Sequence, residues 1–181
     1  IIILSTDRTL KYVLDNGLIP DYTCVNENII TLAGHDLLPD FFFHGTVKSH
    51  AEQITLYYNS LLTLERLKIF QDMGFKTVKF NRQGCGNFDS LNTGANCGMA
   101  LVEIARHLLK IDRIAVIGLD LDNTTSNKLQ PPNSIDAMLT LTKTQILEDF
   151  NIMGQPVYNL TRKGSLHGKG IVETNIDDFL K

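Results

Sequence analysis

The stretch "RIAVIGLDL" (residues 113–121) is the strongest indication of how this chain folds. It is an almost unbroken run of apolar and β-branched residues, which is typical of a strand buried on both faces of a parallel sheet. Strand-like and helix-like patterns alternate on both sides of it. We expect further strands at 1–6, 21–27, 40–45, 77–82 and 156–161, and helices from Asp7 to the stop at Gly17, at 60–73, about 96–109, about 133–149, and after Thr174 or Asn175.

This alternation predicts the fold class. Strands that alternate with helices form a parallel sheet, so we expect an α/β protein with a Rossmann-like, mostly parallel sheet and helices on both faces. The 181 residues suffice for one domain, 1–181, with a sizeable core. The chain starts directly in an apolar run at Ile1, which favours truncation at the N-terminus.

Composition narrows the class of function. The formal net charge of −3 argues against non-specific binding of nucleic acid, which needs a basic surface. No apolar run approaches the roughly 20 residues that span a bilayer, so we expect no membrane span. The cysteines Cys24, Cys85 and Cys97 are odd in number and form no CxxC pair, which favours a reducing, cytoplasmic location over a disulfide framework.

Polar residues gather where the predicted strands end, which is where parallel α/β sheets bind their ligands. Asn26, Glu27 and Asn28 follow the second strand, "DLDN" (120–123) follows the central strand, and "TRKGSLHGKG" (161–170) follows the last. Glu27 could ligate a cation or hold a hydroxyl group, or it could lie in a solvated loop. The basic loop could neutralise phosphate, or simply be a charged surface loop. Together these loops suit a phosphate-bearing ligand, with or without a divalent cation.

The stretch "SLNTGANCGMA" (90–100) leads into the helix expected at about 96–109. Backbone N–H groups at the start of a helix bind anions, glycines let the backbone come close, and polar side chains add donors. These donors are Ser90, Asn92, Thr93 and Asn96, and the glycines are Gly94 and Gly98. The alternative is a helix cap with a glycine for close packing. The position at a strand end and, above all, the family resemblance described below favour an anion cradle, although neither a Walker P-loop nor a GxGxxG pattern is present.

Two carboxylates end the central strand. Asp120 and Asp122 are one residue apart, so an extended backbone would point both to the same side, as a magnesium ion or general-base chemistry would require. In the alternative, Asp122 forms a turn and Asp120 alone matters. Cys97 lies in the first turn of a predicted helix, where its pKa could be lowered. Without a histidine close in sequence, we favour a packing role for this thiol.

Four motifs carry a resemblance to a known family. They are "LKYVLDNGLIPDYTCVNEN" (10–28), "NTGANCGMALVEIA" (92–105), "IAVIGLDL" (114–121) and "VYNLTRKG" (157–164). Their order resembles that of the 6-hydroxymethylpterin diphosphokinase MptE-like family, which includes the motility-accessory-factor glycosyltransferases. The stretch from "SLNTGANCGMA" to "IAVIGLDL" is also similar to bacterial sialyltransferases that use CMP-sialic acid.

The resemblance implies a Rossmann-like transferase that acts on a nucleotide or nucleotide-sugar. Asn92, Thr93, Gly94 and Asn96 match the family's glycine/serine turn, Asp120 matches the aspartate of its "G-x-DL" motif, and Asn159 and Thr161 match its "YNxT" motif. Two features depart from the pattern. The chain lacks a Gly-Pro-Ser-Leu-type loop, and Asn26-Glu27-Asn28 stands where members often have an aspartate. Glu27 could replace that carboxylate, or metal binding could be lost.

Three functions follow. The first is a glycosyltransferase with a nucleotide-sugar donor. In it, the donor phosphate binds at the 92–98 turn with Ser90, Arg162 and Lys163. Asp120 binds the donor or positions the acceptor, and Asp120 and Glu27 are the candidate catalytic residues. The second is an ATP-dependent pterin diphosphokinase that needs Mg²⁺ at Asp120, with Glu27 or Asp122. The third is a non-catalytic nucleotide-binding or structural domain, which the missing glycine loop favours.

Overall fold

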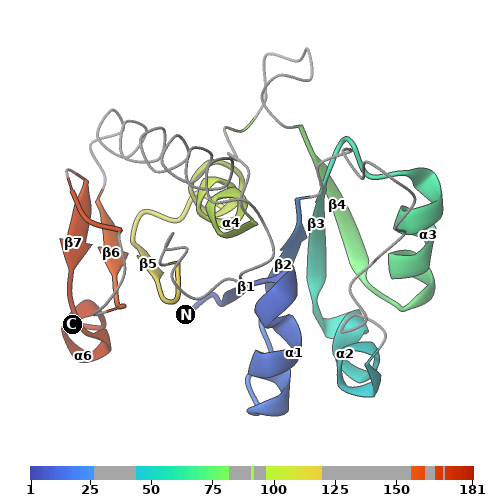
Figure 1. Cartoon of the computed structure of the whole chain (residues 1–181), viewed down its shortest axis with the longest axis horizontal. Helices are drawn as coiled ribbons and strands as arrows, with labels where there is room; N and C mark the ends of the chain where they lie inside the picture. Colours follow the sequence, from blue (N-terminus) through green and yellow to red (C-terminus); the bar gives the residue numbers. More distant parts are fainter. Residues whose placement is uncertain (27–43, 82–90, 92–96, 120–155, 162–165, 169) are drawn as a thin grey trace, which may run out of the picture. The chain divides into compact units, whose positions relative to one another are not determined.

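The computed structural model describes residues 1–26, 44–81, 91, 97–119, 156–161, 166–168 and 170–181 (Figure 1). The chain divides into two compact units, Ile1–Glu103 and Ile104–Lys181. Each unit is described by itself below, and the expected single domain remains a prediction.

The first unit is built on a four-stranded parallel sheet. Its strands are β1 (Leu4–Thr6), β2 (Tyr22–Val25), β3 (Thr55–Asn59) and β4 (Lys76–Phe80), in the order β1-β2-β3-β4. All three neighbouring pairs are parallel. Because the strands are added in chain order and run the same way, all their carboxyl ends lie at one edge of the sheet.

Among the described residues, these strands are connected by α1 (Asp7–Asp15), by α2 (Gly45–His50), which continues into the short helix η2 (Ala51–Gln53), and by α3 (Leu64–Asp72). Helix α1 starts at Thr6, whose side chain accepts a hydrogen bond from the backbone N–H of Thr9. Gly17 follows the helix with a φ of +79°, a left-handed conformation that suits glycine. The start and stop predicted for this helix are therefore close to those observed.

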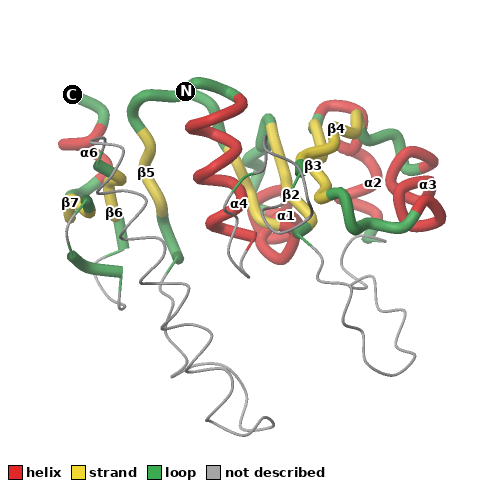
Figure 2. The backbone as a smooth tube through the Cα atoms, turned by 90° about the horizontal axis from the view of Figure 1, so that it is seen from above, coloured by secondary structure: helices red, strands yellow, loops and turns green. Residues whose placement is uncertain are grey.

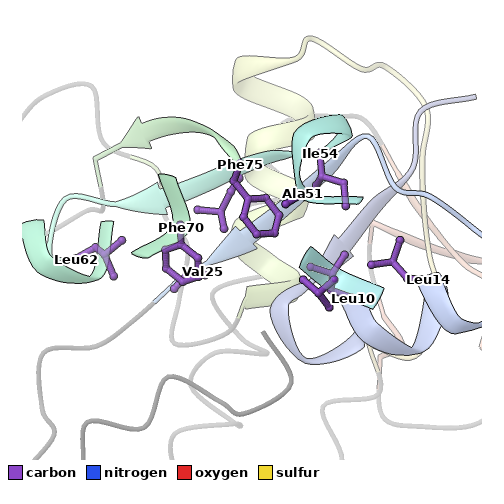
Figure 3. Close-up of a cluster of buried hydrophobic side chains, with 10 residues drawn as sticks. Leu10, Leu14, Val25, Ala51, Ile54, Leu62, Phe70 and Phe75 are labelled. Carbon is purple, nitrogen blue, oxygen red and sulfur yellow. The ribbon is translucent and has the colours of Figure 1, made fainter. Parts of the chain in front are cut away.

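One hydrophobic core joins the three connecting helices to the sheet (Figure 3). Leu10 and Leu14 are four residues apart on α1 and are both buried, as a helical apolar stripe predicts. Phe70 of α3 meets Phe75 edge to face, with ring centroids 6.2 Å apart. The other buried members are Val25, Val47, Ala51, Ile54, Leu56 and Leu62.

Helix α4 (Cys97–Glu103) returns the chain to the start of the sheet. It follows β4 in sequence but contacts β1 and β2. Because crossover connections are right-handed, helices that join successive strands in one direction along the sheet lie on one face. A helix that runs back in the opposite direction lies on the other face. Figure 2 shows α4 on the other side of this sheet from α2 and α3. Helix α4 therefore leads the chain back from β4 to β1 and β2.

The second unit contains the parallel strands β5 (Ile114–Val116), β6 (Val157–Asn159) and β7 (Ile171–Glu173), in the order β5-β6-β7. It also contains the π-helical turn η3 (Ile104–Leu108) and the short helix α6 (Ile176–Phe179), which begins at Asn175 as expected. The Arg113 guanidinium lies over the rings of Tyr158 and Phe179, at 5.3 and 4.8 Å from their centroids. Two parallel sheets with helices confirm the predicted α/β class.

The strand predicted at 113–121 is much shorter than expected. Only Ile114–Val116 forms a strand, and Ile117 is 79% exposed. Gly118 has a φ of +73°, which turns the backbone out of the extended conformation. The prediction of one long, fully buried strand was therefore wrong for 117–119, and residues 120–121 lie outside the described part of the chain.

Other boundaries also moved. His44 is the N-cap of α2, so 44–45 are not part of a strand, and 40–43 lie outside the described residues. The helix predicted at 60–73 begins after its N-cap Thr63. Strands β3 and β7 were not predicted. The helix expected at about 133–149 falls outside the described part.

Candidate ligand site at the carboxyl ends of the first sheet

The return of α4 to β1 and β2 marks one place in the first unit where a ligand is expected. Open α/β sheets bind ligands outside the carboxyl ends of their strands. Three polar residues lie at these ends or at the start of α4. Asp7 is the first residue of α1, directly after β1; Asn26 directly follows β2; and Cys97 is the first residue of α4.

Cys97 lies next to both of the other residues. The backbone N–H of Asn26 donates to Cys97 Sγ at 3.4 Å, and the Cys97 thiol and the Asp7 carboxyl are close enough to shift each other's pKa. On the other side, Asn59 at the end of β3 donates from Nδ2 to Asn26 Oδ1 at 3.0 Å. Asn59 Oδ1 accepts from the backbone N–H of Leu61 at 3.1 Å. Hydrogen bonds therefore link the ends of β2 and β3 with the start of α4, and Asp7 lies beside Cys97 at the end of β1.

Burial changes the acidity of two members of this network. Desolvation raises the pKa of Asp7 above 3.8 and outweighs four opposing effects: the Arg8 backbone N–H, the nearby Cys97 thiol, the Arg8 charge and the backbone N–H of Asp7 itself. Desolvation, with the nearby Asp7 carboxylate, raises the pKa of Cys97 to about 12. The suggestion that a helix start could lower the pKa of Cys97 was therefore wrong. Its thiol is neutral at physiological pH and is a poor nucleophile.

Two buried polar atoms at this edge lack a partner among the described residues. They are Asn26 Nδ2 and Ser60 Oγ, on neighbouring strand ends. Asn26 as a whole is only 8% exposed. A buried donor without an acceptor costs about 1–3 kcal/mol, which a ligand oxygen would offset. The arrangement can thus bind oxygen-rich groups through neutral donors, next to a carboxyl of raised pKa.

Most of the site residues expected from the sequence lie outside the described part of the chain. They are Glu27, Ser90, Asn92, Thr93, Gly94, Asn96, Asp120, Asp122, Arg162 and Lys163. Their expected roles in binding phosphate, Mg²⁺ or substrate stay predictions. Within the described ranges, no three His, Cys, Asp or Glu side chains come together as a metal site would require.

Asn159 and Thr161 are two further expected site residues that the structure describes, and both lie in the second unit. Gly118 N–H donates to Thr161 Oγ1 at 2.7 Å. Thr161 N–H donates to Asn159 Oδ1 at 2.9 Å, and Asn159 Nδ2 donates to the carbonyl of Leu166 at 3.1 Å. These side chains fasten the backbone at the carboxyl ends of β5 and β6. The nucleotide contact expected of them stays a prediction.

Sequence reasoning missed part of the network. Asp7 was considered only as a helix start, and Asn59 and Ser60 were missed because β3 was not predicted. The apolar and aromatic run "ITLYY" (54–58), closed by an Asn-Ser pair, is the signal that could have identified them.

Comparisons with known proteins found no matching family model, no matching curated protein and no matching solved structure. The described part of the chain is therefore an α/β protein with two parallel β-sheets. No helix among the described residues is long and apolar enough to cross a membrane.

Proposed function

We propose that this chain is a glycosyltransferase that uses a nucleotide-sugar donor, and that sugar groups bind at the carboxyl ends of β1, β2 and β3. One observation carries the proposal. Asn26 Nδ2 is buried without a partner among the described residues, and the Asn26 backbone N–H donates to Cys97, which lies beside the Asp7 carboxyl of raised pKa at the carboxyl ends of the strands. The four-motif resemblance is what favours a nucleotide-sugar over other oxygen-rich ligands.

The chemistry of sugar transfer gives these groups defined roles. The acceptor hydroxyl oxygen bonds to the anomeric carbon, while the bond from that carbon to the donor phosphate oxygen breaks and the phosphate leaves with the electron pair. The hydroxyl proton must pass to a base. A carboxylate whose pKa is raised towards neutrality is a better base than an ordinary aspartate, and Asp7 meets this condition. Asn26 Nδ2 and Ser60 Oγ would donate to sugar or ribose oxygens.

The site favours hydroxyl groups over phosphate at this point. A phosphate group in direct contact with the Asp7 carboxylate would meet like charge, whereas a hydroxyl can donate to it. The phosphate contacts expected of the 92–98 turn, and those expected of Arg162 and Lys163, stay predictions from the sequence.

The first test is a thermal-shift panel with CMP, CDP, UDP and ATP, each with Mg²⁺ or with EDTA. We expect a pyrimidine nucleotide to raise Tm without Mg²⁺. At a concentration of 100 Kd the gain is about 2.7 kcal/mol, or roughly 5–10 °C for a chain of this size. Stabilisation by ATP alone, and only with Mg²⁺, would favour the diphosphokinase instead. No shift with any nucleotide would contradict both enzymes.

Replacing Asn26 by Leu tests the donor that lacks a partner. Leucine has a similar shape but no N–H, so the variant should bind the stabilising nucleotide-sugar about tenfold more weakly, the equivalent of one lost hydrogen bond of about 1.4 kcal/mol. Titration calorimetry measures this directly. The control is Asn16→Leu, because the exposed Asn16 side chain donates only to the Tyr12 carbonyl at the end of α1. Equal affinities for Asn26→Leu and the control would remove Asn26 from the site.

A further inference from the structure

We propose that Asn59 is a positioning residue that fixes the Asn26 amide as a hydrogen-bond donor at the ligand site. Asn59 is the last residue of β3, and Asn26 directly follows β2. Val25 is opposite Tyr58 in the parallel register, so the next residues of the two strands, Asn26 and Asn59, come side by side. The ligand group at Asn26 must then be an oxygen with a lone pair. That this oxygen belongs to a sugar or a ribose rests on the proposed function.

One backbone group determines the orientation of both amides. The Leu61 N–H can only donate, so the Asn59 atom that it contacts at 3.1 Å is the oxygen Oδ1. The other end of the Asn59 amide is therefore Nδ2, which donates to Asn26 Oδ1 at 3.0 Å. Because the Asn26 oxygen is used in this bond, the free end of the Asn26 amide is Nδ2, which can only donate.

Burial holds this arrangement in place. Asn59 is fully buried and Asn26 is 8% exposed. If the Asn26 amide turned over, it would lose the hydrogen bond from Asn59 and place two N–H groups against each other. Asn26 Nδ2 and the hydroxyl of Ser60, the residue after Asn59, are both buried without a partner among the described residues. An oxygen with a lone pair fits beside Asn26 Nδ2, whereas a protonated amine, which has none, does not.

A role in the turn after β3 does not account for all these contacts. The backbone carbonyl of Asn59 accepts the Leu62 N–H at 3.1 Å, and its side-chain oxygen accepts the Leu61 N–H. This turn uses only oxygen atoms, which an aspartate or a serine could also supply. Asn59 Nδ2 is not needed for the turn, yet it contacts Asn26, which lies 33 residues earlier in the chain. The two functions of Asn59 can therefore be separated by substitution.

The first test replaces Asn59 by Asp and needs no ligand. The new side chain has the same shape and can still accept the Leu61 N–H, but once ionised it has no proton to donate to Asn26 Oδ1. We expect the Asn26 amide to turn over and to donate from Nδ2 to the new carboxylate. In nitrogen-15 NMR of the full chain, an Asn26 side-chain N–H signal should move downfield as the new carboxyl ionises, which carbon-13 NMR follows in the same samples.

Asn16→Asp is the matched control. It adds the same charge at an exposed side chain, which donates to the Tyr12 carbonyl at the end of α1. The Asn26 side-chain signals of this control should be those of the wild type. Asn26 signals that stay unchanged in Asn59→Asp while the new carboxyl is ionised would overturn the proposal.

The second test measures binding by titration calorimetry, with CMP-sialic acid and UDP-glucose as the probes. Asn59→Ser keeps the turn, because a hydroxyl can accept the same backbone N–H, but serine is too short to hold Asn26. We expect Asn59→Ser to weaken binding about fivefold, the effect of a donor that is no longer held in place. In an Asn26→Leu background there is no amide to position, so adding Asn59→Ser should weaken binding no further.

Losses that add in the double variant would mean that Asn59 acts on the site by another route, and would overturn the proposal. Unchanged binding in Asn59→Ser, with a loss in Asn26→Leu, would do the same. The two proposals can fail separately. A wild-type protein that binds none of the nucleotides and nucleotide-sugars contradicts the proposed function, whereas the NMR test without ligand decides whether Asn59 orients Asn26.

Discussion

Replacing Asp7 by Asn is expected to lower kcat for sugar transfer by about 100- to 10,000-fold, the usual contribution of a general base. Asparagine has the same shape and can still accept the Arg8 N–H that now donates to Asp7 Oδ1. It cannot take the acceptor's proton. The loss should therefore appear in kcat, measured with saturating donor and acceptor, while the affinity for the nucleotide changes little.

The same substitution should make the protein more stable at neutral pH. Burial raises the pKa of Asp7 in the folded state above 3.8, so the folded chain binds this proton more tightly than the unfolded chain does. The stability contributed by Asp7 is complete below the unfolded pKa, and it is lost as the pH rises through the raised folded pKa. The asparagine side chain of the variant does not titrate. The free energy of unfolding of the variant, relative to wild type, should therefore increase across this window and remain higher at pH 7.

Urea unfolding at a series of pH values measures this difference. The control is Asp72→Asn, because Asp72 lies on the surface and pairs with Lys68 at 2.9 Å. An exposed i,i+4 pair contributes only about 0.3–0.5 kcal/mol, so this variant should show a small loss of stability and no loss of transfer. An Asp7→Asn enzyme that keeps full kcat would show that Asp7 is not the base.

The class of the fold could be predicted because it depends on local periodicity. Alternation of buried strands with helices such as α1, whose Leu10 and Leu14 share one face, is visible in the sequence. Strand boundaries depend on more than local pattern. In β3, the adjacent Leu56 and Tyr57 are both buried, so the strand shows no simple alternation. In β5, a positive φ at Gly118 ends the extended backbone inside an apolar run.

The candidate site was less predictable, because tertiary contacts create it. Asn26 could be singled out as a polar residue that follows a buried strand. Asp7 lies beside Cys97, which comes from far along the chain, and local sequence patterns do not reveal this proximity. The shift of the Cys97 pKa could not be predicted for the same reason. Its position at a helix start suggested a lower pKa, but burial and the nearby Asp7 carboxylate raise it.

Replacing Asn159 by Leu is expected to destabilise the protein by about 2–4 kcal/mol. Asn159 is 2% exposed, and both ends of its amide are used by the backbone. Leucine would leave the Thr161 N–H and the Leu166 carbonyl without the partners that they have at 2.9 and 3.1 Å. Each buried backbone group without a partner costs about 1–3 kcal/mol, and the hydrophobic gain of leucine offsets part of this. Urea unfolding of the full chain measures the loss.

Hydrogen exchange locates the effect and separates it from ligand binding. The Thr161 amide should exchange much faster in Asn159→Leu, because its acceptor is gone, whereas amides of β2 and β3 in the first unit should keep their protection. The exposed variant Asn16→Leu should change neither. Nucleotide affinity, measured at a temperature where Asn159→Leu is still folded, then tests the contact that the "VYNLT" motif predicts. Normal affinity with lowered stability would mean that Asn159 serves the backbone at the ends of β5 and β6 and does not contact the nucleotide. An undiminished stability would contradict the hydrogen-bond argument itself.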